Sequence, residues 1–174
     1  MSSSSRDEEF EFVVQQHYQG LYRFALLLTA SDAEARDLAQ QAFCVWAEKR
    51  HTIRDRNKTR SWLVTTLSRE FLKECRRRNR FPESVLDEGA VRAPDLTPDV
   101  ICQLDAKLLC RALRGVQDRY RVPLVLFCLE GRSYLEIART LGIPVGTVKS
   151  RISRGKRQLG AAIAVRGHPA RGPG

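Results

Sequence analysis

The chain has 174 residues, and its 30 Lys and Arg against 20 Asp and Glu leave a formal charge of +10 at pH 7. Apolar residues make up 43% of the chain, which is enough to bury the core of one medium domain or two small ones and excludes a disordered protein. The basic excess favours a polyanionic partner, with nucleic acid ahead of a membrane surface. The first residues lack the apolar run of a signal peptide, and no uncharged segment reaches the length of a membrane span. We therefore expect a cytoplasmic protein without membrane insertion.

The cysteines show no CxxC spacing, and each lies among residues patterned as helix. We expect them to be reduced thiols that act as small core residues. The histidines are far apart, so paired zinc ligands are lacking. The sequence predicts no metal and no other cofactor for these residues: Cys44, Cys75, Cys102, Cys110, Cys128, His17, His51 and His168.

The N-terminal half has the apolar spacing of amphipathic helices. Ser31 and Glu34 form the pattern of a capping box, which marks the start of the second of these helices. The three predicted helices run over residues 7–29, 31–49 and about 61–79, and together they form a first domain over residues 7–80.

Residues 81–99 lose this periodicity and are rich in acids and prolines, which is typical of a flexible linker. Thr97 and Pro98 suit the N-cap and first position of a further helix whose apolar stripe runs to Leu113. Asp118 is expected to cap the next helix. No strand alternation occurs, so we predict an all-α protein with a second domain over 100–160 and a disordered tail over 161–174.

The second domain contains the pattern of a helix-turn-helix. Ser133 and Glu136 form another capping box, and a turn from Gly142 to Pro144 ends the short helix that they open. A second helix begins near Val145 and carries basic residues but no acid to the end of the chain. This arrangement predicts a recognition helix in the major groove of DNA.

A second basic concentration lies in the first domain, where residues 50–80 contain eleven Lys and Arg against three acids. A charge run of this kind is usually a solvated face. Its occurrence beside a helix-turn-helix in the same chain favours a second DNA contact.

Residues 136–159, EIARTLGIPVGTVKSRISRGKRQL, resemble region 4.2 of the extracytoplasmic-function (ECF) sigma factors. Residues 37–43, DLAQQAF, resemble region 2.2 of that family, and Trp62-Leu63 with Arg76 to Arg78 resemble regions 2.3 and 2.4. The resemblance implies a subunit that binds core RNA polymerase and promoter DNA and has no enzymatic activity of its own. Family members are often held inactive by an anti-sigma factor, although no residue here requires one.

The resemblance also assigns residues to three contacts. The −35 element would be bound by Thr147, Lys149, Ser150, Arg151, Arg154 and Lys156. The −10 element would be bound by Arg54, Asn57, Lys58, Arg60, Arg76, Arg77 and Arg80, with a flipped base held in a pocket. The clamp of the largest polymerase subunit would be bound by Asp37, Leu38, Gln40, Gln41 and Phe43. The polymerase flap tip would meet the apolar surface of Leu124, Phe127 and Leu135.

Alternatives stay open at several of these positions. Leu38 and Phe43 are alternatively core residues, and core packing is favoured for Leu38. Core packing and flap-tip contact are equally supported for Leu124, Phe127 and Leu135, and core packing is favoured over base stacking for Trp62. The chain also departs from the family where Arg36 and Gln41 flank the clamp motif and where Arg69 and Lys73 replace the usual Asn and Asp. The rival function is a stand-alone helix-turn-helix regulator that binds a palindromic site as a dimer. An enzyme is disfavoured because no nucleotide-binding loop or nucleophile motif occurs.

Overall fold

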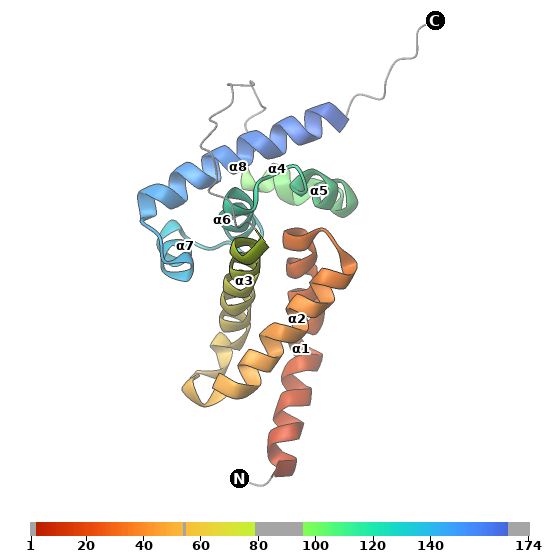
Figure 1. The fold of residues 1–174 in the computed structure, drawn as a ribbon, viewed down its shortest axis with the longest axis vertical. Helices are drawn as coiled ribbons and strands as arrows, with labels where there is room; N and C mark the ends of the chain where they lie inside the picture. Colours follow the sequence, from red (N-terminus) through yellow and green to blue (C-terminus); the bar gives the residue numbers. More distant parts are fainter. Residues whose placement is uncertain (1–2, 54, 79–95, 167–174) are drawn as a thin grey trace, which may run out of the picture. The chain divides into compact units, whose positions relative to one another are not determined.

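The computed structural model describes residues 3–53, 55–78 and 96–166, and every regular element in these ranges is helical. The expected all-α fold is therefore confirmed. Within the same ranges, no helix combines the length and the apolar character needed to cross a bilayer. The chain divides into two compact units, Met1–Glu74 and Cys75–Gly174 (Figure 1), and each is described by itself below.

The first unit is built on two long helices, α1 (Ser3–Thr29) and α2 (Asp32–Lys49), which lie side by side (Figure 1). The chain reverses between them at Ala30, which takes a left-handed backbone conformation with φ of 55°. The Ser31 side chain then accepts a hydrogen bond from the Glu34 amide at 3.5 Å, so the predicted N-cap is confirmed. Helix α3 (Thr59–Arg78) follows after a loop that contains two short 3-10 turns, Arg50–Thr52 and Arg56–Lys58.

The core of this unit uses one face of each helix. Three alanines of α2 are completely buried, and such small side chains let the α1 and α2 backbones approach closely. Large side chains from α1 and α3 fill the rest of the core. The largest contributions are Leu21, Phe24 and Leu28 from α1, Trp46 from α2, and Leu63, Leu67 and Phe71 from α3.

The second unit contains α4 (Pro98–Gln103), α5 (Ala106–Leu113), α6 (Asp118–Cys128), α7 (Tyr134–Leu141) and α8 (Val145–Arg166). Helix α6 is central, because it packs against α4, α7 and α8 and most of its residues are buried. Its Pro123 is the sixth residue of the helix and lies beyond the first turn, so α6 lacks one backbone hydrogen bond there. Thr97 caps α4 through the Val100 amide at 3.4 Å, and Pro98 is the first helical residue, as predicted.

Several boundaries differ from the sequence prediction. The single helix expected from Pro98 to Leu113 is two helices, because Leu104 is extended and the Asp105 carboxylate caps α5 by accepting from the Lys107 amide at 3.0 Å. Asp118 is the first residue of α6, and Gln117 is its N-cap. The linker and tail predictions are also too long, since α4 begins at Pro98 and α8 continues to Arg166. Residues 81–95 of the predicted linker and 167–174 of the predicted tail lie outside the described residues.

The cysteines do not all share the core environment that was expected. Cys128 is buried and Cys75 and Cys110 are half-buried, but Cys44 is exposed on α2. The prediction is therefore wrong for Cys44, and the side chain of Cys102 lies outside the described part of the chain.

Candidate nucleic-acid interface

The helix-turn-helix of the second unit is formed by α7 and α8. The Ser133 hydroxyl accepts from the Glu136 amide at 3.3 Å, and the Glu136 carboxylate accepts from the Ser133 amide at 2.8 Å, so the capping box is complete. Hydrogen bonds from Ser133 hold the pKa of Glu136 below its ordinary value. At the other end of α7, Gly142 has φ of 66°, a conformation that suits glycine, and the chain turns there into α8.

Helix α8 is held against α6 at close range. Val148, Ile152 and Leu159 are buried on its inner face, as the sequence spacing predicted. Between them, a Cβ built on Gly155 would lie only 3.1 Å from the carbonyl oxygen of Tyr120. A glycine at this point therefore sets the separation of the two helices and fixes the direction in which α8 projects.

The residues predicted to bind the −35 element do not all lie on the outer face of α8. Lys149 and Ser150 are exposed, whereas the other four are half-buried. Arg154 lies with a guanidinium nitrogen 3.5 Å from the Tyr120 hydroxyl. The six residues predicted for the −35 element are Thr147, Lys149, Ser150, Arg151, Arg154 and Lys156.

Two lysines of α8 lie over aromatic rings instead of extending straight into solvent. Phe127 and Tyr134 are stacked with their centroids 5.0 Å apart. The Lys149 ammonium lies 5.8 Å from the Tyr134 centroid, and that of Lys156 lies 5.7 Å from the Phe127 centroid. These contacts orient the two lysines along one side of α8.

The sequence reasoning missed two exposed residues of the same helix, Ser153 and Arg157. Ser153 lies three residues after Ser150 and Arg157 lies seven residues after it, so both are on the face opposite the buried Val148 and Ile152. The helical period applied outward from the buried residues would have identified them. With them, the outer face of α8 carries both hydroxyl and guanidinium donors and no acid.

The residues predicted for the −10 element fall into two groups. Asn57, Lys58 and Arg60 are exposed at the second 3-10 turn and the start of α3, where the Asp55 carboxylate accepts from the Asn57 amide at 3.0 Å. Arg76 and Arg77 are exposed in the last turn of α3, roughly 24 Å along the helix from Arg60 at 1.5 Å per residue. Arg54 and Arg80 lie outside the described residues.

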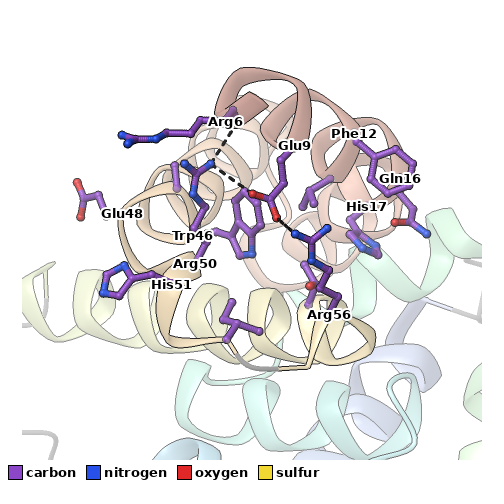
Figure 2. A pocket seen from close by; sticks show the side chains of 14 residues that line it. Arg6, Glu9, Phe12, Gln16, His17, Trp46, Glu48, Arg50, His51 and Arg56 are labelled. Carbon is purple, nitrogen blue, oxygen red and sulfur yellow. Dashed lines mark hydrogen bonds and ion pairs between the residues drawn. The ribbon is translucent and has the colours of Figure 1, made fainter. Parts of the chain in front are cut away.

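A cavity of about 560 Å³ lies beside the loop that joins α2 to α3 (Figure 2). Its walls come from the first half of α1, the end of α2 and the loop itself, including Phe12, His17 and Trp46. Trp46 is only 3% exposed, and its indole nitrogen has no hydrogen-bond partner within the described part of the chain. Burial, together with the nearby positive charge of Arg60, lowers the pKa of His17. No sequence pattern indicates this cavity, because its walls are far apart along the chain.

Trp62 lies in the first turn of α3, directly after the loop, and is half-buried. It is absent from the fully buried core that Leu63, Val64 and Leu67 form on the inner face of α3. Its environment therefore agrees with neither of the extremes considered from the sequence, a core residue or an open stacking platform.

The residues predicted to contact the polymerase clamp occupy α2. Asp37, Gln40 and Gln41 are exposed and Leu38 is half-buried. Phe43 is 3% exposed and its ring stacks on Tyr18 with centroids 6.4 Å apart. Phe43 is therefore a core residue and is removed from the contact set, since a buried ring cannot meet a partner surface.

The positive charge of Arg36, which precedes the clamp motif, is paired within the unit. A guanidinium nitrogen of Arg36 lies 2.9 Å from Asp32, whose other carboxylate oxygen accepts from the Tyr22 hydroxyl. The hydrogen bond from Tyr22 is the main cause that lowers the pKa of Asp32. Arg36 therefore contributes less net charge to this surface than its side chain alone suggests.

Of the apolar residues considered for the flap tip, Leu124 is 1% exposed and belongs to the core. Phe127 is half-buried in its stack with Tyr134, and Leu135 is 51% exposed at the start of α7. Of these three residues, Phe127 and Leu135 present apolar surface.

Comparison with known proteins identifies both units. Residues 13–81 match the model of Sigma-70 region 2, and residues 107–159 match that of Sigma-70, region 4. The chain is 36% identical over 152 residues to the ECF RNA polymerase sigma factor SigE of Mycolicibacterium smegmatis, a match that covers 84% of this chain and 58% of that relative. It is 33% identical over 147 residues to the ECF RNA polymerase sigma factor SigL of Mycobacterium tuberculosis, covering 83% and 82% of the two chains.

The fold agrees with a solved structure from Bartonella quintana, the sigma factor RpoE in complex with the anti-sigma factor NepR. The TM-score is 0.66 at 26% sequence identity, and the alignment covers 91% of this chain and 98% of that one. The similarity therefore extends over both units.

Proposed function

Because this chain belongs to the ECF family of RNA polymerase sigma factors, we propose that it binds core RNA polymerase and directs it to promoters through both of its units. The second unit reads the −35 element, and the first unit recognises the −10 element and helps to open the strands. The observation that carries the proposal is the basic outer face of α8, which α6 and α7 hold as the second helix of a complete helix-turn-helix.

At the −35 element, the first two turns of α8 enter the major groove. Ser150 and Arg151 lie near the base edges, and a bidentate guanidinium contact from Arg151 to guanine supplies specificity. Lys149 and Lys156, which lie over Tyr134 and Phe127, neutralise phosphates at one side of the groove. Arg154 supports this surface through its contact with Tyr120.

At the −10 element, the loop before α3 and the last turn of α3 contact the exposed strand at two separated points. Asn57, Lys58 and Arg60 serve the loop, and Arg76 and Arg77 hold the backbone farther along. The cavity beside the loop supports this assignment, because its volume of about 560 Å³ falls within the range of small-ligand sites and leaves room for an unpaired base.

Contact with core polymerase uses the exposed residues of α2. Asp37, Gln40 and Gln41 follow one another at helical spacing and form one polar surface, which suits docking on the clamp. The apolar surface of Phe127 and Leu135 suits the flap tip. We expect no catalytic activity and no cofactor, and we place the protein in the cytoplasm with its polymerase.

An anti-sigma factor is a further partner to expect. The structural relative RpoE was solved with the anti-sigma factor NepR, and its similarity to this chain covers both units. A partner that covered α2 or the outer face of α8 would block polymerase or promoter binding directly.

The proposal is tested by reconstitution. The purified chain is mixed with bacterial core RNA polymerase, and the holoenzyme is used to transcribe a library of promoter sequences. We expect stable association and initiation at sites that share a −35 and −10 pair. Failure to associate, together with tight binding of the isolated chain to a palindromic site, would instead identify a stand-alone regulator.

Matched variants test the polymerase contact. Asp37→Ala with Gln40→Ala should weaken binding to core polymerase and leave the circular dichroism spectrum unchanged. Gln15→Ala with Gln19→Ala, which changes two exposed residues of α1, serves as the control. Equal affinity of the two double variants would remove Asp37 and Gln40 from the interface.

A further inference from the structure

The first turns of α1 lie outside the residues that match the family model. The match to Sigma-70 region 2 begins at residue 13, whereas α1 begins at Ser3. Within the first turns of α1, Arg6, Glu9 and Phe12 line the cavity beside the loop. These turns therefore face the proposed −10 site.

Glu9 is the centre of these contacts (Figure 2). Its Oε1 lies 3.0 Å from Nη2 of Arg56, and its Oε2 lies 3.8 Å from Nη1 of Arg50. The same nitrogen of Arg50 donates to the carbonyl oxygen of Arg6 at 3.2 Å. One carboxylate thus joins α1 to both 3-10 turns of the loop, at Arg50 in the first turn and at Arg56 in the second.

In the described residues of the loop, the two 3-10 turns are held by polar contacts. Neither of its 3-10 turns contains a buried residue, so hydrophobic packing does not fix their positions. The pair of Glu9 and Arg50 is partly shielded from solvent, because their side chains are 23% and 22% exposed. Such partly shielded pairs are weakened less by salt than fully exposed ones.

We propose that Glu9 is a positioning residue, which ties the α2–α3 loop to α1 and orients Arg56 for contact with the opened promoter strand. The inference rests on the proposed function, since it assigns a role to the loop in strand opening. Arg56 remains 82% exposed while it is paired, and a guanidinium has five N–H donors. Glu9 therefore leaves donors of Arg56 available for a phosphate, so it orients this side chain without removing it from the site.

The test measures strand opening by reconstituted holoenzyme. The probe is a duplex promoter selected from the library above, with 2-aminopurine in its −10 element, whose fluorescence rises when the strands separate. Glu9→Ala should slow opening about three- to tenfold, the range expected for loss of two partly exposed ion pairs. Glu9→Gln, which retains an acceptor oxygen, should be less impaired. The affinity for core polymerase should be unchanged in both variants.

The matched control is Glu11→Ala. It removes the same charge from the same helix, and Glu11 is exposed two residues away, on a different face. Opening at the wild-type rate is expected for this control. A general effect of negative charge near the promoter would slow or speed both alanine variants alike and would overturn the proposal.

A double-mutant cycle with Arg56→Gln separates positioning from a general structural role. If Glu9 acts through Arg56, its substitution should cost clearly less in the Arg56→Gln background than in the wild type. Additive effects, wild-type opening by Glu9→Ala, or faster opening by Glu9→Ala would each overturn the proposal. A wild-type holoenzyme that starts no transcription would instead refute the proposed function, so the two failures are distinguishable.

Discussion

Replacement of Gly155 by alanine tests how tightly the recognition helix is held against α6. The new Cβ would lie 3.1 Å from the Tyr120 carbonyl oxygen and 3.3 Å from Cβ and Cδ2 of Leu124. Leu124 is 1% exposed and the carbonyl belongs to a buried helix, so neither can move without shifting α6. Overpacking of this kind costs about 1–3 kcal/mol. The higher helix propensity of alanine returns about 1 kcal/mol, which leaves a net destabilisation of about 1 kcal/mol.

Gly146→Ala is the matched control, because it makes the same substitution in the same helix. A Cβ at Gly146 would meet nothing within 4 Å, so only the propensity gain, up to about 1 kcal/mol, is expected. Urea unfolding of the full chain, followed by circular dichroism, should give a lower midpoint for Gly155→Ala and an equal or higher midpoint for Gly146→Ala. If Gly155→Ala is stabilised as much as Gly146→Ala, the close packing of α6 and α8 is refuted.

Three further predictions concern α7, α1 and α8. Ser133→Ala should destabilise the fold by about 1 kcal/mol in urea unfolding, because α7 loses its N-cap. The lowered pKa of Glu136 stabilises the fold above the ordinary pKa of 4.5, and this stabilisation should shrink in the variant. The variant should therefore lose stability less steeply than the wild type as the pH falls. Because the pKa of His17 is lowered in the folded state, the unfolded state binds more protons than the folded state as the pH falls below 6.5, and the stability of the fold should decline there. His17→Gln should flatten this decline when unfolding is measured from pH 5 to 8. Arg151→Ala should weaken holoenzyme binding to the selected −35 sequence by about 1–3 kcal/mol and binding to scrambled DNA much less; an equal loss on both would make Arg151 a phosphate contact.

The local features of the fold were predictable because their causes are local. Ser31, Thr97 and the Ser133–Glu136 pair cap helices through amides three residues away, so the short-range sequence contains the whole interaction. The break at Leu104 was missed although its cause is equally local, because the apolar stripe continues from α4 into α5 and hides the cap that Asp105 forms between the two helices.

The amino-acid sequence alone determined the helical class, the helix-turn-helix and the family, because periodicity, capping patterns and charge are properties of neighbouring residues. The tertiary structure decided which side chains are available on those helices. It buried Phe43 against Tyr18, placed Arg154 beside Tyr120, and brought Glu9 to a loop more than forty residues away. These outcomes depend on which helix faces meet, and helical spacing fixes a face without specifying what packs against it.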